Sequence, residues 1–153
     1  MAFQASTGRA GLGVTLEVSD GAGSPTWATV GNVTALSAGG VTINMLSTTQ
    51  LASPDFYTEM TPGLKTSAPW TGTVQFDPDD PTLDSSTGLK KFAEDRTLED
   101  FRLNFTNLGL TFGLQVSAYV SELGNIELGA ESIMSQSFTL TPKGPVEEIT
   151  IAL

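Results

Sequence analysis

The chain has 153 residues, 39% of them hydrophobic, with 17 acidic and 7 basic residues and neither cysteine nor histidine. This length and apolar content suit one globular domain, spanning residues 1–153. Absent cysteine excludes a disulfide framework, and absent histidine removes the commonest general base and transition-metal ligand. The net charge of −10 disfavours ordinary binding to nucleic acid.

The N-terminal segment, residues 1–12, is rich in Gly, Ala and Ser, and we expect a flexible arm there. It lacks the apolar core of a signal peptide, so the product is expected to stay in the cytoplasm where it is made. No apolar run approaches the ~20 residues of a membrane-spanning helix, and we expect no membrane insertion.

Alternation of apolar and polar residues with period two is the main pattern along the chain. Successive side chains of a strand point to opposite faces, so each run predicts a strand with one apolar face. Such strands belong to antiparallel sheets that pack as a sandwich or close as a barrel. The alternating runs lie at residues 14–18, 41–45, 70–76, 101–105, 110–120 and 126–140.

Turn residues connect the last of these runs. Asn107-Leu108-Gly109 and Glu122-Leu123-Gly124-Asn125 both have turn composition, which predicts a meander from Asp100 to Thr141.

One segment, residues 79–95, has helical spacing in Leu89, Phe92 and Ala93. Asp80 before Pro81 is a suitable N-cap and first helical position. Gly88 weakens a helix by about 1 kcal/mol relative to Ala, so the helix should be better formed after it. We expect one short helix that covers an open end or face of the β core.

Residues 47–67 have no steady period and form the longest predicted loop. A solvated loop seldom carries so many large apolar side chains, so we predict that this loop contacts other subunits. Its candidate contact residues are Leu51, Phe56, Tyr57, Met60 and Leu64.

Three patterns could carry chemistry, and each has a plainer explanation. Asp77, Asp79 and Asp80 could bind Ca²⁺, but capping of the helix explains them better. The pairs at 94–95 and 99–100 could hydrolyse a glycoside, but solvated turns explain them better. Trp27 and Trp70 could stack on a sugar, although core or interface packing is the stronger reading. We predict no catalytic, metal or cofactor-binding residue and no cofactor.

The order of these features resembles the tail tube protein of long-tailed (siphovirus-like) bacteriophages, which is related to tube proteins of contractile tails and type VI secretion. The resemblance covers residues 11–144 and rests on order and spacing. It comprises the short arm, the strands GVTLEVSD, TWATVGNVT and GGVTINML, the long loop to Pro62-Gly63, WTGTVQFDPDD before the helix LKKFAED, the FRLNF…LTFGLQVSAYV hairpin and the last strand MSQSFTLTPKGP.

The resemblance implies a β-sandwich or barrel with one flanking helix, the phage tail tube fold. Six copies would form a ring, and stacked rings would form a tube through which double-stranded DNA leaves the capsid without specific binding. The implied partners are further copies and the tape measure, tail terminator and distal tail proteins, with no small-molecule substrate. The implied location is the virion tail, assembled in the cytoplasm of the host bacterium.

An acidic and polar tube wall would repel the DNA backbone. Glu127 and Glu131 lie opposite the apolar phase of their run and are candidates for this wall. Three alternatives remain open: another small tail or decoration protein such as a tail terminator, a carbohydrate-binding β-sandwich, and a carboxylate hydrolase.

Overall fold

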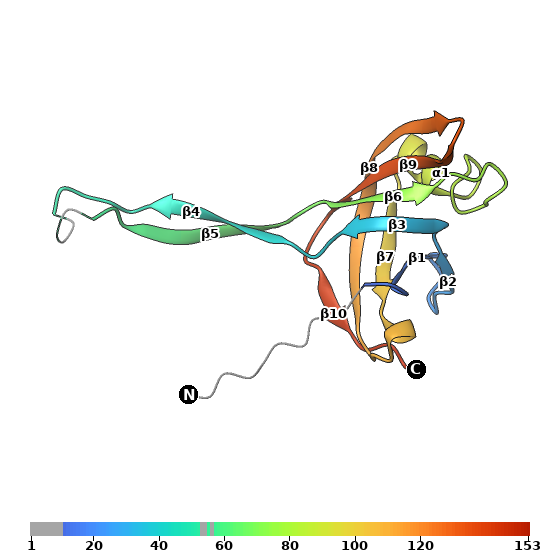
Figure 1. Cartoon of the computed structure of the whole chain (residues 1–153). Helices are drawn as coiled ribbons and strands as arrows, with labels where there is room; N and C mark the ends of the chain where they lie inside the picture. Colours follow the sequence, from blue (N-terminus) through green and yellow to red (C-terminus); the bar gives the residue numbers. More distant parts are fainter. Residues whose placement is uncertain (1–10, 53–54, 56) are drawn as a thin grey trace.

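The computed structural model describes residues 11–52, 55 and 57–153, and strands dominate it (Figure 1). The elements in chain order are β1 (Thr15–Ser19), β2 (Trp27–Thr29), β3 (Asn32–Ser37), β4 (Val41–Ser47), β5 (Met60–Ser67), β6 (Trp70–Gln75), helix α1 (Leu89–Asp95), β7 (Leu98–Asn104), the 3-10 turn η2 (Thr106–Leu108), β8 (Gly113–Gly129), β9 (Ser132–Pro142) and β10 (Glu147–Ile149).

Eight of these strands form one antiparallel sheet with the order β2-β1-β7-β8-β9-β6-β3, and β10 pairs with the start of β8. β8 belongs to both halves of the sheet. Its first part pairs with β7 as far as Tyr119, and its later part pairs with β9 from Ala118 onward. A register shift follows Val120, and such an irregularity bends a strand. The sheet therefore folds over itself, which confirms the predicted mainly-β fold with one short helix.

The core fills the space between the two halves of this folded sheet. Alternate residues of β1, β7 and β8 face alternate residues of β6 and β9, so the period-two pattern of these runs is confirmed. Leu89 of α1 is fully buried and closes one end of the core. The largest fully buried side chains are Trp70, Phe101, Phe138, Leu16, Leu89 and Leu140.

The predicted turn at residues 122–125 is wrong, because β8 continues through it to Gly129. The register shifts between Leu123 and Ile126, and the Gln136 Nε2 donates to the carbonyl of Gly124 at 2.9 Å. Gly and Asn thus mark a bulge in a continuous strand, since bulges and turns favour the same residue types. The chain reverses instead between β8 and β9, at Ala130 and Glu131. The other predicted turn is confirmed: Asn107 and Leu108 lie in η2, and its C-cap Gly109 has a φ of 74°.

The predicted helix is confirmed only after Gly88, and the predicted cap at Asp80 is wrong. Gly88 is the N-cap and offers no side-chain bond. Asp80 instead accepts hydrogen bonds from the backbone N–H and the hydroxyl of Thr82, at 2.9 and 2.6 Å. A short acidic side chain stabilises such a local turn as readily as a helix terminus, which is why its sequence pattern was ambiguous.

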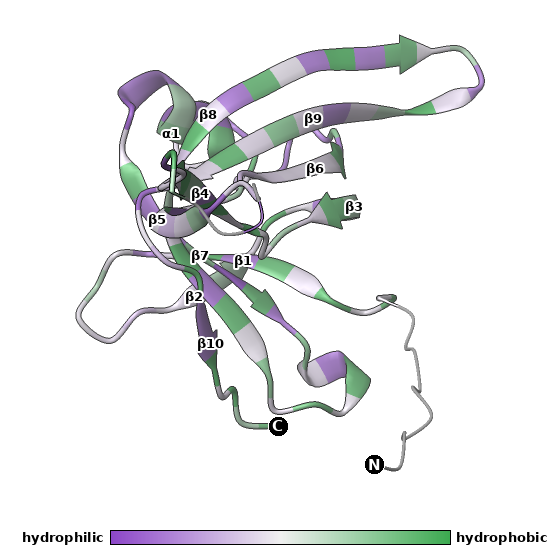
Figure 2. Ribbon diagram, turned by 90° about the vertical axis from the view of Figure 1, so that its left-hand side faces the viewer, coloured by the Kyte–Doolittle hydropathy of each residue, from purple (hydrophilic) through white to green (hydrophobic). Residues whose placement is uncertain are grey.

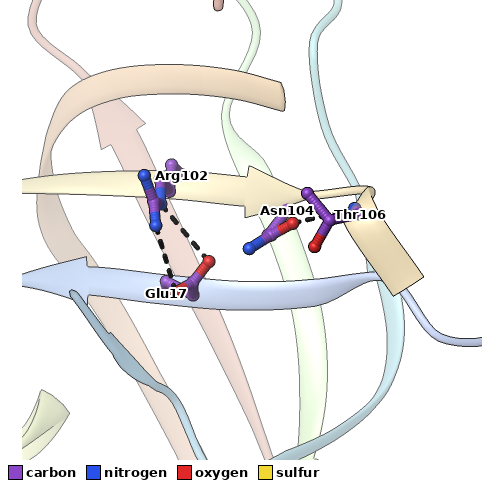
Figure 3. Close-up of polar contacts among 4 residues, drawn as sticks. All are labelled: Glu17, Arg102, Asn104 and Thr106. Carbon is purple, nitrogen blue, oxygen red and sulfur yellow. Dashed lines mark hydrogen bonds and ion pairs between the residues drawn. The ribbon is translucent and has the colours of Figure 1, made fainter. Parts of the chain in front are cut away.

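The face of the sheet opposite the core carries a partly buried ion pair (Figure 3). Nε of Arg102 on β7 lies 3.3 Å from Oε1 of Glu17 on β1, and Glu17 is only 7% exposed. The guanidinium also lies over the ring of Trp27 on β2, 4.4 Å from its centroid. Glu17 is register partner to both Arg102 and Thr29, so this cluster joins three neighbouring strands near the edge of the sheet.

Leucine-to-alanine substitutions at one buried and one exposed position test which strands pack on the core. Leu140→Ala removes a fully buried side chain from β9 and should lower the free energy of unfolding by about 2–5 kcal/mol. Leu64→Ala, at a residue that is 83% exposed on β5, should change it by no more than about 0.5 kcal/mol. Urea unfolding of the monomer followed by circular dichroism measures both. Equal losses would contradict the assignment of β5 to the exterior.

Candidate assembly surface

β4 and β5 form a separate two-stranded sheet that projects away from the folded body (Figure 1). They pair from Val41 with Ser67 to Ser47 with Met60. The predicted loop over residues 47–67 is therefore wrong from Met60 onward, where the chain forms β5. The sequence signal was weak because neither face of β5 packs on the body, so nothing selects alternating apolar residues.

Large apolar side chains of this hairpin are exposed to solvent. We name them the apolar hairpin; its described members are Val41, Ile43, Met45, Leu46, Leu51, Tyr57, Met60 and Leu64. Tyr57 is 73% exposed and Leu51 is fully exposed. Phe56, the fifth predicted contact residue, lies outside the described residues. The structure thus brings Leu51, Tyr57, Met60 and Leu64 onto one projecting element.

Four of these residues were missed as contact candidates: Val41, Ile43, Met45 and Leu46 on β4. The alternation of residues 41–45 predicted a strand with one buried face, but every residue of β4 is exposed. Alternation shows that the two faces of a strand differ in polarity, but it does not show which surface covers the apolar face. The neighbouring apolar loop was the available signal that this strand leaves the core.

Hydrogen bonds join the residues that follow β4 to the residue that precedes β5. The Thr49 hydroxyl donates to the carbonyl of Glu59 at 3.2 Å. The Thr49 hydroxyl oxygen also accepts a hydrogen bond from the Glu59 N–H at 2.7 Å. The Thr48 N–H also donates to the Glu59 carbonyl, at 2.9 Å. The exposed apolar groups therefore sit on a hairpin that is paired as far as Thr48.

The end of the β8–β9 hairpin is a second exposed apolar region. Alternating apolar and polar bands run along both strands, and the pattern continues beyond the part that covers the core (Figure 2). Leu128 and Ile133 are 73% and 70% exposed, and Ile126 and Met134 are partly exposed. Beside this end, α1 and the loop before it enclose a groove of about 510 Å³, lined by apolar residues such as Leu83 and Leu123 and by the acids Asp77, Asp84 and Glu94.

Glu127 and Glu131, the predicted wall residues, lie close to this apolar end. Glu127 is an exposed residue of β8, between Ile126 and Leu128 in sequence. Glu131 is exposed in the turn to β9 and so does not share a strand face with Glu127. The structure places both acids at the same end of the molecule.

Among the described residues, no group of three or more acidic side chains could hold a metal ion. Asp77 accepts a hydrogen bond from the Asp79 N–H at 3.0 Å, and Asp80 is occupied by Thr82. Asp77 and Asp80 thus each stabilise a local turn. Asp84 does the same, and the Thr87 N–H lowers the pKa of its carboxyl.

Glu99 and Asp100, one of the acid pairs considered for glycoside hydrolysis, have separate environments. Glu99 and Asp100 are consecutive on β7 and therefore point to opposite faces of the sheet. Burial raises the pKa of Glu99, whereas Asp100 accepts a hydrogen bond from the Ser117 hydroxyl at 2.5 Å. Neighbours on a strand thus do not provide the facing carboxylates of a glycosidase.

The two tryptophans do not form a sugar-stacking platform. Trp70 is 0% exposed in the core. Trp27 lies against the guanidinium of Arg102 on the opposite face of the sheet. The packing interpretation is therefore correct for Trp70. Separately, no helix within the described ranges is long and apolar enough to cross a bilayer.

The chain matches no protein-family model and no curated protein sequence. Its fold, however, matches solved structures over nearly its whole length. A chain from the tail of an empty gene transfer agent (GTA) particle, refined with C6 symmetry, has a TM-score of 0.71 and 15% identity, covering 95% of this chain and 100% of the other. A chain of the anti-feeding prophage tube-terminating cap has a TM-score of 0.68 and 13% identity, covering 98% and 96%.

A chain of the SPP1 tail tube has a TM-score of 0.63 and 12% identity, covering 91% of this chain and 78% of the other. The three similar structures come from different particles, and each shares the overall fold at 12–15% sequence identity. This chain therefore has the fold found in tube and terminator chains of phage-like tails.

Proposed function

We propose that the chain is a non-enzymatic structural subunit whose copies assemble into the tube of a phage or phage-like tail. The observation that carries this proposal is the apolar hairpin. Contiguous exposed apolar surface of this kind marks an interaction site. The shared fold with chains of assembled tubes and caps supports further copies of this chain as the surface that covers it.

The assembled form that we propose is a stack of rings with six copies each. A ring needs a contact that repeats head to tail and closes by rotation, and stacking needs a second contact along the axis. The apolar hairpin and the β8–β9 end are two separate exposed surfaces, as such an assembly requires. The six-fold symmetry of the similar GTA tail supports the ring number. Residues 1–153 act here as one assembly domain.

The tube would conduct double-stranded DNA to a host cell without binding it specifically. The net charge of −10 supports this role, because a negative wall repels the phosphate backbone. Glu127 and Glu131 would be part of that wall. The tape measure, tail terminator and distal tail proteins are the proposed partners, and the virion tail, assembled in the bacterial cytoplasm, is the proposed location.

Polar substitutions on the hairpin should separate folding from assembly. The triple variant Ile43→Thr, Met45→Thr, Leu64→Thr should fold with an unchanged melting temperature, because all three side chains are exposed. It should not polymerise, because the apolar contact is lost. Negative-stain microscopy shows rings or rods, and sedimentation measures the assembled fraction.

The control is Leu98→Thr with Leu153→Thr, two exposed apolar positions outside both hairpins. This control should assemble like the wild type. Normal rods from the triple variant would refute the hairpin's role, and a wild-type chain that stays monomeric at high concentration would refute the tube.

Charge reversal tests the proposed wall. Wild-type tubes should not retain DNA, whereas tubes of Glu127→Lys with Glu131→Lys should retain it at low salt and release it as the salt concentration rises. Co-sedimentation of labelled DNA with tubes measures retention. Glu147→Lys with Glu148→Lys makes the same charge change on β10 and is the control. Equal retention by both variants would contradict a specific wall at the β8–β9 end.

A further inference from the structure

An apolar groove of about 580 Å³ separates β1 from β3. Leu16 and Leu103, two core residues, are among its lining residues, so the groove reaches the core from outside. The side chains that line it include Leu12, Val14, Val33, Leu36 and Phe105. Unlike the apolar hairpin, this surface is concave, so it has room for a segment of another chain.

The groove exists because the folded sheet does not close. β2 pairs with β1 from Glu17 to Ser19, and the Val30 N–H donates to the carbonyl of Leu16 at 2.8 Å. The chain then turns at Gly31, and β3 pairs with β6 on the other half of the sheet. β1 and β3 thus diverge from this corner.

β3 is the last strand of the sheet order, so its outer edge has no strand partner among the described residues. A free edge beside an apolar groove suits the addition of one extended segment. Its backbone would pair with β3, and its alternate side chains would enter the groove.

We propose that residues 3–7 of a second copy bind this groove as an added strand beside β3. The proposal rests on the assembly proposed above. Residues 1–10, with the predicted N-terminal arm, lie outside the described residues, and the chain joins the body at Gly11. Phe3 and Ala5 alternate with Gln4 and Ser6, which is the period of a strand with one apolar face.

The order of residues favours a second copy over the same chain. The described chain begins at Gly11, which itself lines the groove. The residues nearest to it, from Gly8 to Ala10, are small or charged and would fill an apolar groove poorly. Phe3 is eight residues away, or roughly 26 Å in an extended chain, whereas a six-residue strand such as β3 spans roughly 20 Å. An extended arm therefore carries Phe3 beyond its own groove.

Cysteine pairs test this contact directly, because the natural chain has no cysteine. Gln4→Cys keeps Phe3 and Ala5 intact, and Ala35→Cys lies at an exposed position of β3. Paired strand residues have Cα atoms about 4.5–5.5 Å apart, within the range that a disulfide spans. The two single-cysteine chains are mixed, assembled and oxidised, and disulfide-linked dimers are quantified by non-reducing electrophoresis.

The control pairs Gln4→Cys with Ser24→Cys, another exposed position outside the groove. We expect several-fold more linked dimer with Ala35→Cys than with Ser24→Cys. Normal rods with equal yields would overturn the docking proposal alone. A chain carrying both Gln4→Cys and Ala35→Cys that links within itself would overturn the choice of a second copy. Absence of rods from the wild-type chain would count against the proposed function instead.

A second measurement does not depend on cysteine. Phe3→Ser should leave the melting temperature of the monomer unchanged and reduce the assembled fraction, and Phe3→Leu should restore assembly, because an apolar side chain again fills the groove. Unchanged assembly by Phe3→Ser would contradict the proposal.

Discussion

A sheet of two strands has no second layer, so every apolar side chain on β4 and β5 faces water until another surface covers it. The hydrophobic contribution of such a side chain is realised only when water is excluded. In the folded body, the bend of β8 provides that second layer, and the core forms between the two halves of one sheet. The projecting hairpin has no equivalent within the chain. This difference between the two sheets underlies the proposed assembly.

The sequence predicted the body of the fold well where burial enforces alternation. The residues of β1, β6, β7 and the first part of β8 face a packed core, so any change of phase would expose apolar side chains. The helix after Gly88 was predictable because Leu89, Phe92 and Ala93 pack on one side. Each of these positions packs in or against the core, and its apolar residue type indicates that environment.

Prediction failed where one residue type serves several structures. Gly124 and Asn125 suit a bulge as well as a turn, and Asp80 suits a local turn as well as a helix cap. β10 has only three residues and was not predicted, because so short an edge strand leaves no periodic signal. For the candidate surface, the sequence identified apolar residues without a place in the core. It could not show that β4 joins them, because the exposure of β4 depends on the long-range course of the chain.

Pro62 affects how readily the projecting hairpin of an unassembled chain pairs with other strands. It lies on β5 opposite Met45, beside the register shift that follows Ile43. Proline has no N–H to donate, and an irregular register twists the ribbon, so the hairpin is a poor template for open-ended stacking of strands into amyloid-like fibrils. Both features oppose uncontrolled strand pairing by an element that exposes much apolar surface.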